Sequence, residues 1–154
     1  MSTDPSKAAP RETPNLGVLL REPFRIGSEL LHEHFAANGH PDVRAPHGNV
    51  MQFLDDEGTR VSDLARRAQI TKQSMAELVA HLERHGYVER APDPNDRRAK
   101  LVRTTARGRE LHAIARAFVA DLEESWGRRL GKRRMGQLKE LLADLNRVVA
   151  ETGR

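Results

Sequence analysis

Two short helical segments separated by a three-residue turn, followed by two β-prone segments, constrain the fold of this chain more than any other feature. Ser62 is a favourable N-cap for a helix over residues 63–68, and Thr71 is a favourable N-cap for a second helix that ends near residue 85. Gly86 suits the left-handed backbone conformation that often ends a helix. The succession of helix, turn, helix and strand pair is typical of a winged helix-turn-helix.

The second helix of this pair has a clear amphipathic pattern. Met75, Leu78, Val79 and Leu82 recur at the spacing i, i+3, i+4 and i+7, which places them on one face. We expect this face to pack into the core rather than to bind a cofactor. The opposite face is expected to be exposed and consists of Lys72, Gln73, Ser74, Ala76, Glu77, Ala80 and His81.

The strand pair is predicted to form a hairpin. Residues 87–90 become extended after the helix, and residues 100–103 return as the partner strand. Residues 92–96 form the connection and include two prolines and an asparagine. This spacing predicts a loop that is longer than a two-residue turn.

Longer helices are predicted on both sides of this central module. Apolar residues recur at helical spacing over residues 15–36, where Pro23 is expected to kink or interrupt the helix. A short helix is predicted over residues 46–56. Thr105 is a favourable N-cap for the longest helix, which is expected to break near Gly131. The final helix begins near residue 132, and its apolar residues follow a spacing close to the seven-residue repeat of paired helices.

Composition excludes several classes of function. The 154 residues are enough for one domain. The absence of cysteine excludes disulfides, thiolate nucleophiles, thiol redox sensors and cysteine-built zinc sites. No apolar run approaches the roughly 20 residues that cross a bilayer, so we expect a cytoplasmic protein without a membrane partner. Residues 1–14 contain three prolines and few apolar side chains, which predicts a disordered arm.

The sequence of residues 61–111 resembles the DNA-binding region of the MarR family of transcriptional regulators. The resemblance is carried by the dipeptide Leu64-Ala65, the run LVAHLERHGYVER, the wing motif DPNDRRA and the T-x-x-G pattern that begins at Thr105. Family membership implies an α+β, mainly helical fold within residues 15–154. The winged helix-turn-helix lobe would span about residues 44–105, and the dimerisation helices would span residues 15–36 and 106–151.

The same resemblance implies a homodimer that binds double-stranded DNA at a palindromic operator and most often represses transcription. It also implies a small, often aromatic or phenolic effector that binds between the dimerisation helices and the DNA-binding lobe. Neither a cofactor nor a metal is expected. The implied DNA-binding residues are Ser62, Thr71, Lys72, Gln73, Ser74, Asp96, Arg97 and Arg98. The implied dimerisation residues are Leu16, Leu19, Leu20, Leu138, Leu141, Leu142, Leu145, Val148 and Val149.

The residue types at these positions suit contact with DNA. Short polar side chains and free amides at the start of a helix can bind phosphate, and Gln73 can pair with an adenine edge in the major groove. Arg98 is suited to a narrow minor groove, with the Asp96 carboxylate holding its guanidinium. Glu77 does not fit this pattern, because a carboxylate repels phosphate unless it accepts from a cytosine amino group.

The charge distribution agrees with a contact in the middle of the chain. The formal net charge is only +4. Residues 58–110 nevertheless hold twelve basic and seven acidic side chains, whereas residues 1–57 hold five and nine. A polyanion would therefore meet the central module rather than the N-terminal helix.

Three alternatives remain open from the sequence. A winged helix can serve as a protein-interaction module without sequence-specific DNA binding. His81 and His85 have the spacing of metal ligands on a helix, and His32 and His34 form a second pair, but neither pair has an evident third ligand. An enzyme that converts a bound aromatic molecule is disfavoured because the chain lacks the familiar phosphate-loop, nucleophile-elbow and zinc-protease motifs.

Overall fold

The computed structural model describes residues 14–152, so the predicted disordered arm lies outside the described residues except for Pro14. In chain order the elements are α1 (Leu16–Ala37), the 3₁₀ helix η1 (Ala45–His47), α2 (Gly48–Met51), α3 (Val61–Ala68), α4 (Lys72–Arg84), β1 (Val88–Asp93), β2 (Asp96–Thr104), α5 (Ala106–Leu130) and α6 (Lys132–Thr152). The fold is mainly helical with one antiparallel strand pair, which confirms the predicted winged helix-turn-helix class. Among the described residues, no helix has both the length and the apolar character needed to cross a bilayer.

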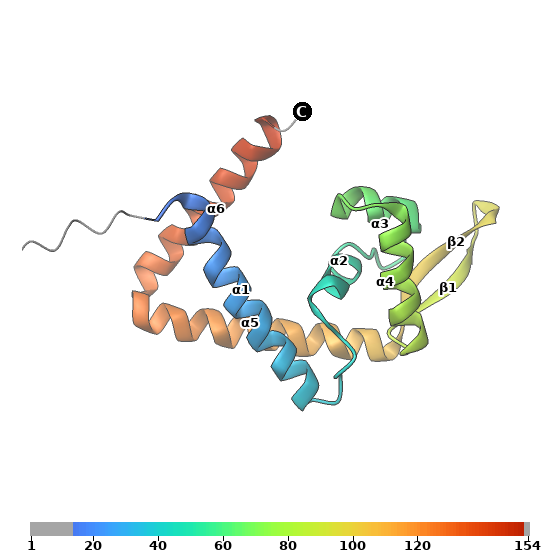
Figure 1. Cartoon of the computed structure of the whole chain (residues 1–154), viewed down its shortest axis with the longest axis horizontal. Helices are drawn as coiled ribbons and strands as arrows, with labels where there is room; N and C mark the ends of the chain where they lie inside the picture. The colour runs from blue at the N-terminus through green and yellow to red at the C-terminus, as the bar shows by residue number, and fades with distance from the viewer. Residues whose placement is uncertain (1–13, 153–154) are drawn as a thin grey trace, which may run out of the picture.

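The elements form a compact lobe and an extended helical part (Figure 1). The lobe contains α2, α3, α4 and the hairpin, and α5 runs from the lobe to the far end of the molecule. Helix α1 packs against α5, and α6 follows α5 at the end remote from the hairpin. The core lies in the lobe, where the fully buried side chains are Val50, Leu64, Met75, Val79, Leu82, Tyr87, Val88 and Val102.

The predicted core face of α4 is confirmed. Met75, Val79 and Leu82 are buried, and Leu78 packs against the same cluster while remaining partly exposed. Ala76, Ala80 and His81 are exceptions to the predicted exposed face, because all three are partly buried. The His81 ring stacks between two other histidines. A neighbouring loop therefore covers a position that periodicity places in solvent.

Helix α1 is continuous through Pro23, so of the two predicted effects of this proline, a kink or an interruption, the interruption does not occur. Pro23 lies on the exposed surface of the helix, where the carbonyl that lacks its usual amide donor can bond to water. The Asn15 side chain caps the helix by accepting a hydrogen bond from the Val18 amide at 3.1 Å. These features keep a helix with an internal proline intact.

The second helix is shorter than predicted. It follows a 3₁₀ turn and ends at Met51 rather than near residue 56. Beyond it the chain turns at residues 52–53 and again at 56–57, and Thr59 then pairs with Val102 of β2 through two backbone hydrogen bonds of 2.9 Å. The Thr59 hydroxyl also accepts from the Asp55 amide. Pairing with a distant strand thus overrides the local helical pattern.

Helix α3 begins earlier than the sequence suggests, at Val61. Arg60, with an extended backbone, is the N-cap residue, and Ser62 lies within the first turn instead of capping it. The assignment of Ser62 as N-cap is therefore wrong. The tight turn to α4 is as predicted, with Gln69 in the left-handed conformation at φ 55° and Thr71 capping α4. Gly86 adopts φ 76° immediately after α4, as its position predicts.

The hairpin turn is shorter than predicted. Asp93 pairs with Asp96, which leaves only Pro94 and Asn95 between the strands, and the register shifts at residues 92–93. The prediction of a longer loop is therefore wrong. The Asp93 carboxylate accepts from the Asn95 amide at 2.9 Å, and the Asp96 carboxylate accepts from the Arg98 amide at 3.0 Å. These two side chains provide the local bonds that shape the turn.

The T-x-x-G pattern joins the lobe to α5. Thr105 caps α5 by accepting from the Gly108 amide at 3.1 Å, and its hydroxyl donates to the Gly86 carbonyl at 2.6 Å. A Cβ atom on Gly108 would lie 2.2 Å from the Tyr87 carbonyl oxygen. Only glycine permits this approach, so the pattern fixes the start of α5 against the end of α4.

Candidate nucleic-acid interface

The first turn of α4 presents the predicted polar residues to solvent. Thr71, Lys72, Gln73 and Ser74 are all exposed. The Thr71 side chain accepts from the Ser74 amide at 3.1 Å, and its hydroxyl donates to the Ser74 hydroxyl at 2.9 Å. Capping therefore uses one amide of this turn and leaves the turn accessible to a ligand at the positive end of the helix dipole.

Gln73 and Glu77 are joined by a hydrogen bond along the exposed face of α4. The Gln73 Nε2 atom donates to Glu77 Oε1 at 3.4 Å. The Glu77 carboxylate, whose charge does not suit contact with DNA phosphate, thus has a hydrogen-bond partner on its own helix. Because this bond occupies one amide hydrogen, Gln73 retains its second hydrogen and its carbonyl oxygen for an adenine edge.

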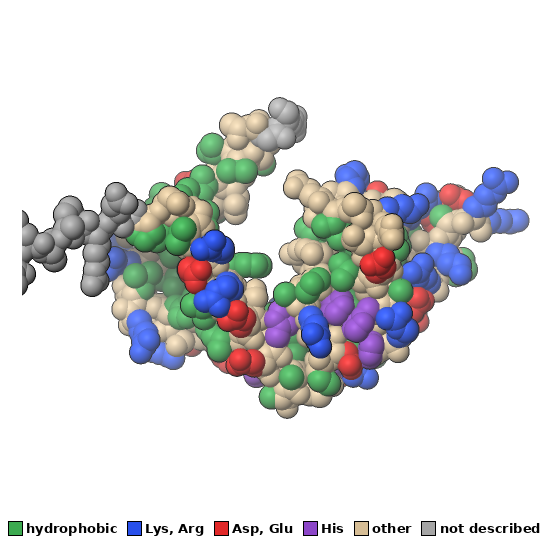
Figure 2. All heavy atoms as spheres, viewed as in Figure 1, with side chains coloured by type: hydrophobic (Ala, Val, Ile, Leu, Met, Phe, Trp, Pro, Cys, Tyr) green, Lys and Arg blue, Asp and Glu red, His purple; other side chains and the backbone are tan. Residues whose placement is uncertain are grey.

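The wing carries two exposed arginines. Arg97 and Arg98 lie just after the turn, and neither forms an ion pair with any residue in the range 14–152. Figure 2 shows basic side chains gathered at the outer end of the hairpin. The Asp96 carboxylate binds the Arg98 backbone amide and the Arg60 guanidinium, so it does not hold the Arg98 guanidinium as expected.

A pair of residues that the sequence did not single out anchors the wing. The Arg60 Nε and Nη2 atoms donate to the Asp93 carboxylate at 2.9 Å and 2.5 Å, and Asp93 is only 6% exposed. The Asn95 amide and the Arg60 guanidinium hold the pKa of Asp93 below its ordinary value. No spacing rule links residues so far apart in the chain, so this contact has no signal in the sequence.

Helix α3 carries an exposed serine, and both of its arginines are engaged in contacts within the chain. Ser62 is exposed in the first turn of α3. Arg66 pairs with Asp63 at 3.1 Å, and Arg67 bonds to Asp55 and to the Phe53 carbonyl. Helix α4 packs against α3 and β1, so the predicted residues of both helices and the wing belong to one lobe.

The predicted histidine pairs serve packing. His47, His81 and His85 form a stack with ring centroids 4.3 and 4.4 Å apart, visible as a group of histidines in Figure 2. Burial, together with His81 and His85, lowers the pKa of His47 to about 4. His34 lies against the ring of Phe118. Within the described part of the chain, no three histidine or carboxylate residues are arranged to hold a metal ion.

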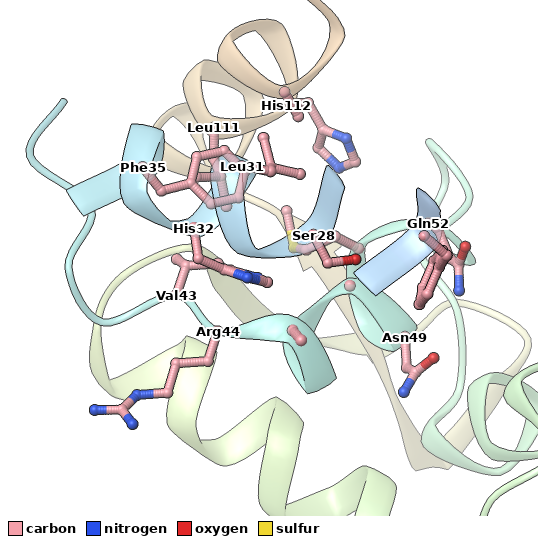
Figure 3. A pocket seen from close by; sticks show the side chains of 15 residues that line it. Ser28, Leu31, His32, Phe35, Val43, Arg44, Asn49, Gln52, Leu111 and His112 are labelled. Carbon is pink, nitrogen blue, oxygen red and sulfur yellow. The ribbon is translucent and has the colours of Figure 1, made fainter. Parts of the chain in front are cut away.

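A cavity of about 330 Å³ lies between α1, the η1–α2 segment and α5 (Figure 3). Its inner wall is apolar and includes Leu31, Phe35 and Leu111. Arg44 is the sole arginine or lysine among its lining residues, and its side chain extends away from the cavity. The polar lining residues are Ser28, His32, Asn49, Gln52 and His112. Several separate segments build this cavity, and sequence reasoning did not identify it.

The helices predicted to dimerise expose many apolar side chains. Leu16 is 54% exposed and Leu141 is 66% exposed, and no residue of α6 is buried. Leu142 and Leu145 are partly exposed. The other strongly exposed members of the predicted set are Leu19, Leu20, Leu138, Val148 and Val149. Within one chain, α6 therefore packs mainly against the end of α5, where Lys139 pairs with Glu123.

Comparison with known proteins places these features in a family. Residues 42–99 match the family model described as MarR family. The transcriptional regulator HosA of Escherichia coli O111:H- is 33% identical over 133 residues, which cover 84% of this chain and 96% of HosA. The chain belongs to the MarR family of transcriptional regulators. The resemblance carried by the wing motif and the T-x-x-G pattern is thereby confirmed.

Solved structures share the fold of this MarR-family protein at low sequence identity. CouR from Rhodococcus jostii RHA1, bound to p-coumaroyl-CoA, matches with a TM-score of 0.66 and 24% identity over 85% of this chain and 91% of CouR. A point mutant of MepR from Staphylococcus aureus, bound to an oligodeoxyribonucleotide, matches with a TM-score of 0.60 and 19% identity over 89% of this chain and 99% of MepR. These likenesses show that the arrangement of α1 to α6 recurs in solved structures.

Proposed function

We propose that this MarR-family protein is a sequence-specific repressor that binds a palindromic operator as a homodimer and responds to a small aromatic or phenolic effector. The observation that carries the proposal is the pair of exposed arginines on the wing, free of ion pairs within residues 14–152, beside the exposed first turn of α4. An α-helix fits the major groove, and arginine is favoured in the narrow minor groove next to it.

Each implied DNA contact has a distinct chemical role in this proposal. Thr71, Ser74 and Ser62 are exposed at helix starts, where hydroxyls and amides bind phosphate and set the position of the lobe. Gln73 and Lys72 face the base edges and supply sequence preference. Arg97 and Arg98 bind the backbone and the minor groove. The structure of the MepR mutant with an oligodeoxyribonucleotide supports a DNA-binding role for this architecture.

The uncovered apolar faces of α1 and α6 support the proposed dimerisation. A single lobe offers too few base contacts to select one genomic site, whereas a twofold axis places two lobes on half-sites about one helical turn apart. Burial of side chains such as Leu141 against a second copy would remove apolar surface that one chain leaves in water. Residues 15–36 and 106–151 are the proposed dimerisation segments, and about residues 44–105 the DNA-binding lobe.

The cavity between α1, α2 and α5 is the proposed effector site. It lies where the helical part meets the lobe, so a molecule within it contacts both. Such a molecule changes DNA binding only if its affinity differs between the two spacings of the DNA-binding lobes. The CouR structure with p-coumaroyl-CoA supports the inference that this fold binds aromatic ligands.

The decisive experiment is selection of bound sequences from random duplex DNA, followed by affinity measurements at several salt concentrations. We expect a palindrome with half-sites about 10 base pairs apart, and an affinity that falls steeply and linearly in a log–log plot against salt. Gln73→Ala should bind with relaxed sequence preference. No sequence preference together with a flat salt dependence would refute the proposal and favour a protein-interaction module.

A further inference from the structure

Glu77 is a carboxylate on α4 that no cation compensates within the described part of the chain. Glu83, the other acidic residue of α4, pairs with Arg90 at 3.1 Å. Glu77 forms no ion pair with any residue between 14 and 152. Its exposed side chain accepts a hydrogen bond from Gln73 Nε2 at 3.4 Å. The fold itself therefore does not require a negative charge at this position.

Glu77 and Gln73 project from the middle of the exposed face of α4. Successive residues of an α-helix are rotated by about 100°, so the buried Met75, Val79 and Leu82 define one direction across the helix. Gln73 and Glu77 lie within about 30° of the opposite direction. When α4 enters a major groove with its buried face toward the lobe, these two side chains face the floor of the groove. The nearest groups there are base edges rather than phosphates.

A carboxylate in this place favours one base. In the major groove guanine presents only acceptors and thymine presents a carbonyl and a methyl group, whereas cytosine presents its N4 amino group as a donor. Adenine presents a donor beside an acceptor, which suits the amide of Gln73 better than a carboxylate. The Oε1 atom of Glu77 accepts from Gln73, so Oε2 is free to accept from a base. Glutamine and glutamate at these two positions therefore match adenine and cytosine.

We propose that Glu77 determines specificity by accepting a hydrogen bond from the N4 amino group of a cytosine in each half-site. Residues four apart rise by about 6 Å along a helix and base pairs are about 3.4 Å apart, so this cytosine lies one or two base steps from the adenine that Gln73 binds. At every site without the cytosine, the same charge weakens binding. This inference rests on the proposed function, in which the lobe binds DNA sequence-specifically.

Selection of bound sequences from random duplex DNA with the wild type, Glu77→Gln and Glu77→Ala tests the proposal. The wild-type half-site should contain a cytosine one or two steps from an adenine. Glu77→Gln supplies a donor and an acceptor in a side chain of the same size, so the preference at that position should change from cytosine to adenine. Glu77→Ala should accept every base there.

Glu89→Gln is the matched control for the change of charge. Glu89 is exposed on β1 of the same lobe, and it also forms no ion pair with any residue in the range 14–152. This variant should keep the wild-type base preference at every position. Because position 77 is exposed and both glutamine and alanine favour a helix, all variants should melt close to the wild-type temperature.

A modified operator tests the same contact from the DNA side. N4-methylcytosine still pairs with guanine, but its methyl group replaces the amino hydrogen that points into the major groove. In fluorescence anisotropy, this base at the selected position of both half-sites should weaken wild-type binding by about tenfold or more. The same change should alter the affinity of Glu77→Ala by less than about twofold, because that variant makes no contact with the amino group.

Three results would overturn the role of Glu77. The first is an unchanged preference at the cytosine position in Glu77→Gln, and the second is an equal loss on N4-methylcytosine for the wild type and Glu77→Ala. The third is relaxed preference at the adenine position alone, which would show that Glu77 only positions Gln73. In each case the wild type would still select a palindrome and the proposed function would stand. A wild type without any sequence preference would refute the proposed function itself.

Discussion

The Arg60 guanidinium holds the buried carboxylate of Asp93 with two hydrogen bonds and thereby ties the start of α3 to the turn of the wing. Asp96 lies 3.4 Å from the same guanidinium. The orientation of Arg97 and Arg98 therefore depends on Arg60, and two helices and one strand, α3, α4 and β1, separate Arg60 from them in the chain. A contact in the folded lobe, rather than the wing sequence alone, sets where these arginines lie.

Asp93→Asn should lower the free energy of unfolding at neutral pH, with a loss that shrinks in acid. The Asn95 amide and Arg60 depress the pKa of Asp93, so its stabilising contribution is present above the ordinary aspartate range near pH 4 and is lost as pH falls through the lower folded-state pKa. Urea unfolding of both proteins at pH 7 and pH 3 measures the difference. An equal difference at both pH values would contradict this role.

Gly108→Ala should destabilise the protein by about 3 kcal/mol, because the added methyl group would overlap the Tyr87 carbonyl and cannot be accommodated without backbone movement. Gly48→Ala is the control, since a Cβ atom there meets no atom within 4 Å and alanine favours a helix. Thermal and urea unfolding would compare the two variants. Equal stability would show that α5 can shift freely against the lobe.

His47→Gln should flatten the dependence of stability on pH between about 6.5 and 4. Burial and the adjacent histidine rings lower the pKa of His47 to about 4, so the unfolded chain binds a proton that the folded chain does not over this range. Wild-type stability therefore falls on acidification by up to about 3 kcal/mol from this group. Glutamine does not titrate, and its side-chain oxygen can still accept from the Arg44 amide that now donates to His47. Parallel stability curves for the two proteins would rule out this contribution.

Leu141→Asp should weaken the proposed homodimer by about 100-fold or more, because each of two symmetric copies places a charge where about 1.5–3 kcal/mol of apolar burial is otherwise gained. Sedimentation velocity at several concentrations gives the dissociation constant. Asn146→Asp, which adds the same charge at an exposed polar position of α6, should leave it unchanged. A stable Leu141→Asp dimer would place the interface elsewhere.

Arg98→Ala should weaken binding to the operator by about 1–3 kcal/mol through loss of a groove contact and should reduce the slope of the salt dependence. Because Arg98 is exposed and without an ion pair among the described residues, its removal should leave the melting temperature unchanged. Fluorescence anisotropy with a labelled operator measures the affinity. Unchanged affinity and salt slope would remove Arg98 from the interface.

Local signals in the sequence predicted much of the fold. The caps at Thr71 and Thr105, the left-handed Gly86 and the buried stripe of α4 each depend on residues within about one or two helical turns. The start of the final helix after Gly131 was equally evident. Short-range preferences of this kind act before tertiary contacts form and survive in the folded chain.

Contacts between distant segments account for what the sequence did not predict. The Thr59–Val102 bridge shortens α2, and the bond from Arg60 to Asp93 accompanies the earlier start of α3. The hairpin turn is tighter than the prolines at positions 92 and 94 suggest, because the Asp93 carboxylate accepts a hydrogen bond from the Asn95 backbone amide. The cavity between α1, α2 and α5 is likewise assembled from separate segments, so no motif marks it. The proposed DNA-binding residues could be named from the sequence because they all lie within one uninterrupted stretch, residues 61–111, that resembles the family.

A C-terminal helix without a single buried residue has a consequence for control of gene expression. If α6 is covered only in a dimer, and the dimer is the form that binds the operator, the concentration of dimers at low abundance grows with the square of the concentration of chains. A twofold change in synthesis then becomes an almost fourfold change in promoter occupancy. The amount of the regulator would then act as an input alongside its proposed effector.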